Sequence, residues 1–395
     1  MKSFSLTICI LLLAAGSSFS QKVDIKKAFK HADQQTLVML KEIEKTKATA
    51  TKKDLVTPRT LENGHLRMVA SKDWTSGFFP GELWFLYEYT GKQIWLDQAK
   101  AFTKLIEPEQ FNGKTHDMGF KIYCSVGTGY RITKDKHYRE VIIKSAKTLA
   151  TRFNPKTGVI LSWDHSRDKW VNPVIIDNMM NLELLFEATA LTGDSSFYKI
   201  AVSHANTTIK NHFRPDYSSY HVVDYDPNTG AVLKKQTHQG YSHESAWSRG
   251  QAWALYGYTM CYRFTKDPAY LNQAEHIAAF MLKHKNMPAD LVPYYDFDAP
   301  NIPDEPRDVS AAAVTASALY ELGSYSKEKN MYYQKADVML NSMATKYASP
   351  AGKNKGFILV SSTGSKPSES EVDVPLSYAD YYYLEALLRY KALKR

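Results

Sequence analysis

The apolar residues of the chain recur mostly at the three- and four-residue spacing of amphipathic helices. Strong runs of the alternating pattern typical of strands are absent, so one predicted helix follows another. The stretch VIIDNMMNLELLF, residues 174–186, shows how such a helix begins, because Asp177 follows three apolar residues and leads into a helical run. Asp is a preferred N-cap, so the local sequence alone predicts that Asp177 caps a helix.

A short signature recurs five times between the predicted helices. Each copy has Thr or Ser, then Gly or Lys and a polar residue, with an aromatic residue five or six positions after the Thr or Ser. Such a segment ends one helix and starts the next, and the aromatic side chain is expected to pack back against the preceding helix. The copies begin at Tyr89, Ile132, Leu191, Phe264 and Tyr325.

These turns join five helix pairs and leave one helix near residues 23–46 and another near residues 375–393. The two remaining helices are predicted to pair and close a ring. Six helical hairpins in a ring make an all-α fold, an (α/α)6 barrel. The irregular spacing of the turns argues against a fixed-period solenoid. No linker rich in Gly, Pro or Ser divides the chain, so residues 21–395 are predicted to form a single catalytic barrel domain.

This topology places all the tight turns at one end of the barrel and all the long connections at the other. Long loops on a rigid scaffold often carry function. The residues at the starts of the inner helices are therefore predicted to line one pocket. These starts are expected near Trp74, Asp117, Asp177, Glu244, Arg307 and Pro375.

Composition fits a large folded core, with 44% hydrophobic residues in 395. The 26 Tyr and 7 Trp suit a sugar-binding cleft, because these rings offer an apolar face and a polar edge, although large helical cores also use Tyr. The net charge of +9 is spread along the chain, and no basic block resembles a nucleic-acid-binding tail. The excess either steers anionic sugars to the protein or serves solubility alone.

The N-terminus MKSFSLTICILLLAAGSSFS, residues 1–20, has a basic residue, an apolar stretch and small residues at its end. This order predicts a secretory signal peptide that is cut near Ser20. Cys9 lies inside the apolar run, so no lipid anchor is expected, and the apolar run is too short for a membrane span. Export to the periplasm is the expectation.

Removal of the signal would leave Cys124 and Cys261. They could pair in an exported protein, but both lie in apolar helical contexts, where buried free thiols are equally expected. No compact zinc-binding motif is present, so neither a metal nor another cofactor is predicted.

The predicted pocket gathers two carboxylates, several hydrogen-bonding groups and Trp side chains, which together suggest a binding site. Arg249 and Trp253 lie one helical turn apart on one face, so the Arg could grip a carboxylate beside a stacking Trp. Two carboxylates in different surroundings can have their pKa values pushed apart. The candidates are Asp117 and Asp177, with Trp74, His116, Trp163, His221, Thr237, Gln239, Arg249 and Trp253.

The segments WTSGFFPGELWFLYEYTG, HDMGF, IIDNMMNLELLFEA, HQGYSHESAWSRGQAWALYGY and YADYYYLEALLR together resemble the unsaturated glucuronyl hydrolases, glycoside hydrolase family 88. The resemblance covers nearly the whole predicted mature chain in the right order, and it implies an (α/α)6 barrel. It also implies hydrolysis of fragments left by polysaccharide lyases, by addition of water across the carbon 4–carbon 5 double bond of an unsaturated uronic acid. The hemiketal product opens and releases the adjacent sugar.

By the same resemblance, Asp177 is both cap and catalyst, acting as the main acid and base, and Asp117 is the second essential carboxylate. His116, His221 and Gln239 are expected to orient substrate and water. Arg249 would bind the uronate region with Thr237 nearby. Trp74, Trp163 and Trp253 would form stacking walls.

The substrate class stays open between several glycans. Ser365 and Lys366 in the loop SSTGSKPSESEVDVP favour a sulfated glycosaminoglycan disaccharide, with unsulfated fragments as the alternative. Rival functions are an unsaturated rhamnogalacturonyl hydrolase, an epimerase or lyase on the same barrel, and a non-catalytic glycan-binding protein. The expected partner is the oligosaccharide alone, without nucleic acid or membrane, and the protein is expected to be a monomer or small homo-oligomer.

Overall fold

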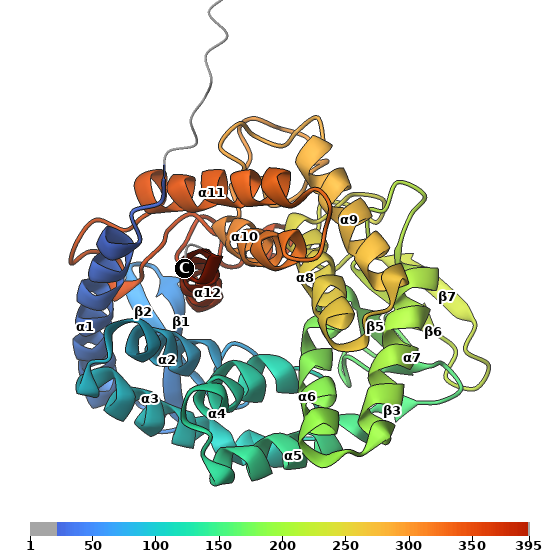
Figure 1. The fold of residues 1–395 in the computed structure, drawn as a ribbon, viewed down its shortest axis with the longest axis horizontal. Helices are drawn as coiled ribbons and strands as arrows, with labels where there is room; N and C mark the ends of the chain where they lie inside the picture. Colours follow the sequence, from blue (N-terminus) through green and yellow to red (C-terminus); the bar gives the residue numbers. More distant parts are fainter. Residues whose placement is uncertain (1–21, 394–395) are drawn as a thin grey trace, which may run out of the picture.

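The computed structural model describes residues 22–393, which form two concentric rings of helices (Figure 1). The signal peptide predicted for residues 1–20 lies outside the described residues. The outer ring contains α1 (Ile25–Thr49), α3 (Gln93–Ile106), α5 (Lys136–Ala150), α7 (Ser195–His212), α9 (Pro268–Lys283) and α11 (Lys329–Lys346). The inner ring contains α2 (Phe78–Thr90), η2 and α4 (Gly119–Gly127 and Thr128–Thr133), α6 (Leu182–Thr192), α8 (Ser248–Thr265), α10 (Val309–Gly323) and α12 (Ser377–Leu393).

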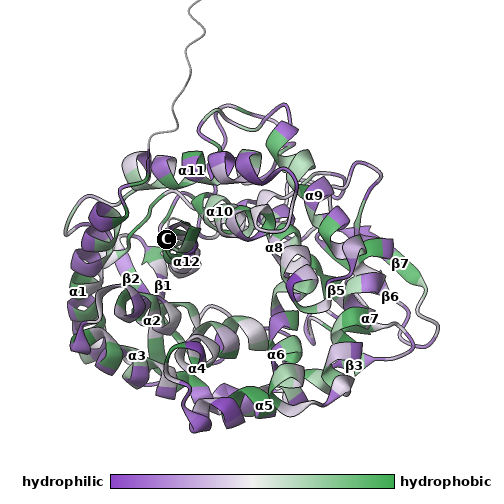
Figure 2. Cartoon of the chain, viewed as in Figure 1, coloured by the Kyte–Doolittle hydropathy of each residue, from purple (hydrophilic) through white to green (hydrophobic). Residues whose placement is uncertain are grey.

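The predicted (α/α)6 barrel is confirmed, and α12 contacts both α1 and α2 to close the ring. Outer helices such as α1 and α11 mix hydrophilic and hydrophobic residues (Figure 2). Most residues of the inner helices α8 and α10 are buried. Inner helices therefore lack a simple amphipathic stripe, because both of their sides face protein.

The tight turns form for the reasons that the recurring signature suggested. At the end of α2, Gly91 has φ +66°, and its N–H donates to the Tyr87 carbonyl. The Thr90 hydroxyl donates to the Leu86 carbonyl and accepts the Lys92 N–H. The same bonds recur around Thr133, Thr192 and Thr265.

An Asp then starts the next helix in three of these turns, as its carboxylate accepts a backbone N–H from the first turn. The three are Asp135, Asp194 and Asp267. The aromatic residues of the signature are buried as predicted, at Trp95, Tyr138, Phe197, Tyr270 and Tyr332. The other two turns lack such a cap, because neither Lys92 before α3 nor Glu328 before α11 makes a side-chain capping bond.

The long connections contain short strands and 3-10 turns that the sequence pattern did not predict. β1 (Leu55–Glu62) and β2 (His65–Ala70) form a hairpin, and β3 (Phe153–Asn154) pairs with β4 (Val159–Ile160). β5 (Pro173–Ile175), β6 (Val222–Tyr225) and β7 (Val232–Gln236) form an antiparallel sheet. The 3-10 turns are η1 (Glu107–Phe111), η3 (Ile176–Asn181), η4 (Asn354–Gly356) and η5 (Lys366–Ser368).

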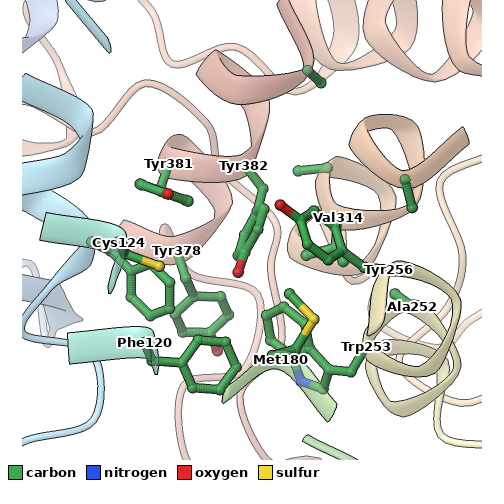
Figure 3. Packing of buried hydrophobic residues seen from close by; sticks show 14 of the residues in the cluster. Phe120, Cys124, Met180, Ala252, Trp253, Tyr256, Val314, Tyr378, Tyr381 and Tyr382 are labelled. Carbon is green, nitrogen blue, oxygen red and sulfur yellow. The ribbon is translucent and has the colours of Figure 1, made fainter. Parts of the chain in front are cut away.

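A layer of aromatic side chains crosses the middle of the barrel (Figure 3). The ring centroids of Phe120 and Trp253 lie 5.1 Å apart, and those of Trp253 and Tyr382 lie 5.5 Å apart. Tyr378 lines a pocket on one side of this layer, whereas Tyr382 lines a cavity of about 320 Å³ on the other. The layer therefore separates the loop end of the barrel from the tight-turn end.

Ion pairs join four inner helices at the tight-turn end. Arg263 of α8 contacts Glu183 of α6 at 2.8 Å and Glu321 of α10 at 3.0 Å. Arg389 of α12 contacts Glu321 at 2.7 Å, and Glu385 accepts a hydrogen bond from Tyr256. These partners leave little free charge in the cavity, so we assign this network to holding the ring together.

Two carboxyl groups are buried between α1, α2 and α12. Glu82 accepts a hydrogen bond from Thr36 at 2.8 Å, and Asp380 accepts the backbone N–H groups of Ile358 and Leu359. Burial raises the pKa of both carboxyls, and the charge of Glu82 raises the pKa of Asp380 further. A pair of this kind is stable while at least one member is protonated.

We expect Glu82→Gln to reduce the loss of stability at alkaline pH. A carboxyl whose pKa is raised by folding stabilises the fold below its unfolded-state pKa, and this contribution is lost as pH rises through the folded-state pKa. Between about pH 6 and about pH 9, the free energy of unfolding should fall less in the variant, by about 1–2 kcal/mol. Urea unfolding at both pH values measures this, with the exposed Glu44→Gln of α1 as the control. An identical pH dependence in wild type and variant would contradict the raised pKa of the Glu82 carboxyl in the folded protein.

Candidate active site

A pocket of about 300 Å³ opens at the loop end of the barrel, above the aromatic layer. Its walls come from segments that precede or begin the inner helices, as the topology predicted. Of the predicted site residues, seven line it, namely Trp74, His116, Asp117, Trp163, Asp177, Gln239 and Arg249. The other lining residues are Arg59, His165, Ile175, His238, Gly364, Ser365, Ser368, Ser370, Glu371 and Tyr378.

Asp177 lies in the 3-10 turn η3, not at the start of α6. The N-cap position of η3 is Ile175 and that of α6 is Asn181, and neither makes a side-chain capping bond. The prediction that Asp177 caps a helix is therefore wrong. The 3-10 turn places its carboxylate in the pocket, where Oδ2 is buried without a hydrogen-bond partner among the described residues.

The surroundings of Asp177 bring the pKa of its carboxyl close to neutral pH. Burial raises its pKa to about 7, against the opposing effects of the Arg249 guanidinium and of the nearby Trp253 indole. The negative charge of Asp117 raises the pKa as well. A carboxyl of this kind can donate and accept a proton near neutral pH.

His221 lies beside Asp177 in a fixed tautomer. Its Nδ1 accepts the backbone N–H groups of His238 and Gln239, both at 3.2 Å, so Nδ1 carries no proton. The proton of the neutral ring is then on Nε2, which lies 3.7 Å from Asp177 Oδ2. Burial lowers the pKa of His221 well below the ordinary range, which keeps the ring neutral. His221 therefore offers an N–H donor toward Asp177 or toward a group bound between them.

Asp117 is the more exposed of the two carboxylates. Its Oδ2 accepts the Thr115 hydroxyl at 2.9 Å, and its Oδ1 lies 3.3 Å from Nε2 of His116. His116 is buried, and burial lowers its pKa, so the ring is neutral. The two carboxyls of the pocket thus have different surroundings, as two groups with different roles in proton transfer require.

Part of the Arg249 guanidinium is occupied by hydrogen bonds to other residues of the chain. Its Nη1 contacts Asp308 at 2.5 Å and donates to the Thr363 carbonyl, and its Nη2 donates to the Gly364 carbonyl at 2.6 Å. Gln239 donates to the same Gly364 carbonyl at 2.9 Å. A guanidinium has five N–H donors, so Arg249 keeps some of them for the pocket while its position is fixed.

The comparisons with known proteins place the chain in a family. The sequence profile of Glycosyl Hydrolase Family 88 matches residues 44–264. An unsaturated glucuronyl hydrolase of Formosa agariphila is 54% identical over 81% of this chain and 80% of its own length. The chain belongs to glycoside hydrolase family 88. It is accordingly a glycoside hydrolase by descent, on the barrel fold that the turns predicted.

Other family 88 proteins are similar over most of their length. An unsaturated chondroitin disaccharide hydrolase of Streptococcus pneumoniae is 34% identical over 86% of this chain and 87% of its own length. The crystal structure of an unsaturated glucuronyl hydrolase specific for heparin is 45% identical, with a TM-score of 0.88 over 93% of this chain and 98% of that chain.

Three residues predicted for the family 88 site do not line the pocket, namely His221, Thr237 and Trp253. His221 lies beside Asp177, as described above. Trp253 is fully buried in the aromatic layer against Phe120 and Tyr382, so it is not a stacking wall. It lies one helical turn after Arg249 on α8, and its indole near Asp177 lowers the pKa of that carboxyl. Thr237 accepts the Gly240 N–H at 2.8 Å, which shapes the turn before Gln239.

The two remaining Trp residues do form walls. Trp74 and Trp163 are both half-buried and face the pocket from different loops. Trp74 packs against Tyr378, with 5.0 Å between the ring centroids, and this contact fixes the Trp74 ring. Two partly exposed indoles on a polar pocket are typical of sites that bind sugar rings.

Sequence reasoning missed several family 88 pocket residues. Tyr378 lies in the first turn of α12, where its hydroxyl is buried without a hydrogen-bond partner among the described residues. The Arg249 guanidinium lies over its ring, 5.4 Å from the centroid. Arg59 of β1 contacts Glu371 at 2.6 Å and Asp73 at 2.9 Å, so it ties the first hairpin to the last pocket loop. The predicted helix start near Pro375 was a signal that could have identified Tyr378. The contact between Arg59 and Glu371 joins residues too distant in sequence to be paired by inspection.

The two cysteines of the described chain are not paired with each other. Cys124 and Cys261 are buried free thiols, so the alternative of a disulfide between them is wrong. Within residues 22–393, no three His, Cys, Asp or Glu side chains gather as metal ligands would. The same part of the chain contains no helix that is both long and apolar enough to cross a membrane.

Proposed function

We propose that the protein is an unsaturated glucuronyl hydrolase that acts on disaccharides from glycan lyases. The observation that carries this proposal is the buried Asp177 carboxyl, whose pKa of about 7 lets it give and take a proton near neutral pH. Its neighbours Asp117 and Arg249 and the walls Trp74 and Trp163 suit an acidic sugar ring. The relatives above are named for this activity or for the related hydrolysis of unsaturated chondroitin disaccharides.

The reaction begins with protonation of carbon 4 by the neutral form of Asp177. Positive charge then develops on carbon 5 and the ring oxygen, and the carboxylate of Asp117 stabilises it. Water adds its oxygen to carbon 5 and returns a proton to Asp177, which restores the acid form. The hemiketal opens, and the adjacent sugar is released. Protonation of carbon is difficult, so an acid with a pKa near the working pH is favourable.

Binding of the uronate carboxylate is assigned to Arg249 and Tyr378. Asp308 and the Thr363 and Gly364 carbonyls hold the guanidinium in place, so little side-chain entropy is lost when substrate binds. The free hydroxyl of Tyr378 can donate a hydrogen bond to the same carboxylate. His116, His221 and Gln239 orient the ring hydroxyls and the attacking water.

A sulfated glycosaminoglycan disaccharide is the proposed substrate class. The relative that is 45% identical is described as specific for heparin. The crystal structure of a Streptococcus agalactiae relative, 29% identical with a TM-score of 0.76, contains a 6-sulfated disaccharide, dGlcA-GalNAc6S. Ser365 lines the pocket of this chain, together with Ser368 and Ser370, but Lys366 does not.

We also propose export to the periplasm. This rests on the sequence of residues 1–20 alone, which has the order of a secretory signal. Residues 22–393 form one barrel, which supports the single domain proposed for the mature chain.

The test is digestion of chondroitin, heparin and hyaluronan with lyases, followed by addition of the protein. We expect the ultraviolet absorbance of the conjugated double bond to disappear for at least one of these products. Unsaturated rhamnogalacturonan fragments form a fourth arm. Activity on those fragments alone would replace the proposed substrate class with pectin fragments, and no loss of absorbance in any arm would contradict the proposed function.

A further inference from the structure

The lining of the pocket includes two chemically different groups of residues. One is the loop that contains Ser365, Ser368 and Ser370, whose side chains are neutral. The other is built around Trp163, with His165 and His238 as further lining residues. Asp177 is more buried than either group, so a sugar attached to a uronate in the pocket would meet these residues.

His165 and His238 flank the indole of Trp163. The ring of His165 stacks on it at 5.3 Å between centroids with an interplanar angle of 23°. The ring of His238 meets it edge-on at 5.3 Å and also contacts Trp170 at 5.9 Å. The two imidazoles therefore flank the indole, with His165 over one of its faces and His238 against it edge-on.

Both imidazoles keep hydrogen-bonding atoms for a ligand. His165 uses Nδ1 in a 2.9 Å contact with the Ser166 hydroxyl, which leaves Nε2. Neither ring nitrogen of His238 makes a hydrogen bond to any side chain or backbone group in the described part of the chain. The backbone of His238 is nevertheless held, because its N–H donates to Nδ1 of His221.

The charges around these imidazoles favour an anion. His165 and Lys169 both act on His238 to lower its pKa, in addition to burial, so three basic groups lie close together. The nearest acid in sequence, Asp164, is already paired with Arg152 at 3.0 Å and lies 3.5 Å from Arg167. Asp168 is on the same loop, but it does not line the pocket.

We propose that His165 and His238 form a subsite for a sulfate group on the sugar next to the unsaturated uronate. This proposal rests on the proposed function and names the residues that select its substrate. A sulfate bound there would accept hydrogen bonds from both imidazoles and relieve the repulsion among the basic groups, while the sugar ring stacks on Trp163. The structure thus assigns sulfate recognition to His165 and His238, which line the pocket, and not to Lys366, which does not line it and which the sequence suggested.

The test compares kcat/KM for unsulfated, 4-sulfated and 6-sulfated unsaturated chondroitin disaccharides, and for 6-sulfated heparin-type disaccharides. The variants are His165→Gln, His238→Gln and the double variant. We expect wild type to prefer at least one sulfated disaccharide over its unsulfated counterpart. The double variant should lower this preference about fivefold or more, mainly through KM, because two charge-assisted hydrogen bonds are lost.

Three controls separate this role from a structural one. His137→Gln changes an exposed histidine at the tight-turn end, where it pairs with Glu107. Ser368→Ala changes the serine loop of the pocket and leaves both imidazoles in place. Thermal unfolding of each variant shows whether it folds. His165 is exposed, so the His165→Gln variant is expected to fold like the wild type.

The outcomes are distinct. A wild-type preference that falls in the double variant and not in Ser368→Ala supports the subsite. An equal loss on sulfated and unsulfated disaccharides, an unchanged preference, or a wild-type preference for unsulfated disaccharides would overturn it. Failure of wild type on every unsaturated disaccharide would overturn the proposed function itself, and the subsite with it.

Discussion

Replacement of Asp177 by Asn is expected to lower kcat/KM about 10³-fold or more, with little change in stability. Asn keeps the shape of Asp but cannot deliver a proton to carbon 4 or take one from water. The carboxyl makes no capping bond, and its Oδ2 has no partner within the described residues, so the fold does not depend on it. An amide is also easier to bury than a carboxylate, so unfolding temperature should stay equal or rise slightly.

The measurement is loss of absorbance at the unsaturated bond, with enzyme in excess if turnover is slow. Asp168→Asn is the matched control, because Asp168 is exposed and does not line the pocket. That control should keep full activity. Residual activity of Asp177→Asn above about a tenth of wild type is incompatible with a direct role in proton transfer.

The barrel could be predicted because short local sequence patterns determine its tight turns. Thr90–Gly91 and Thr192–Gly193 each combine a left-handed glycine with a Thr hydroxyl that bonds on both sides of the turn. These interactions span at most five residues, so the sequence shows them directly. The strands were missed because most are too short to show alternation, and β5 pairs with β6 across some fifty residues.

The sequence could predict which segments form the site, but not which of their residues reach the pocket and which are buried beneath it. The topology brought Asp117, Asp177 and Arg249 to one end, and the structure has them in one pocket. Trp253 was misplaced, because an inner helix is buried on all sides and the sequence does not tell where the pocket floor ends. Asp177 was assigned as a cap because an Asp before a helix has that preference, whereas here a 3-10 turn precedes the helix.

Contacts between distant loops were beyond a reading of one sequence. Asp308 illustrates this, since it caps α10 through the N–H groups of Ser310 and Ala311 and also binds Arg249. Its local sequence shows the cap alone. The second contact depends on how α8 and α10 pack side by side, which is a tertiary property.

Replacement of Asp117 by Asn is expected to lower kcat/KM about 10²–10³-fold and to shift the pH profile toward acid. The rate falls because the carboxylate no longer stabilises positive charge at carbon 5. The profile shifts because the charge of Asp117 helps to raise the pKa of Asp177. Without that charge, Asp177 loses its proton at lower pH.

The sign of the shift follows from which form of Asp177 reacts. Protonation of carbon 4 requires the acid form, so kcat/KM of wild type should fall as pH rises through about 7. In Asp117→Asn the same fall should begin at lower pH, and thermal unfolding should show that the variant is folded. Lys114→Ala, an exposed change on the same loop, is the control and should keep the wild-type midpoint. A midpoint that stays fixed or moves to higher pH in Asp117→Asn would show that another group controls the profile, because removal of a neighbouring negative charge can only make Asp177 more acidic.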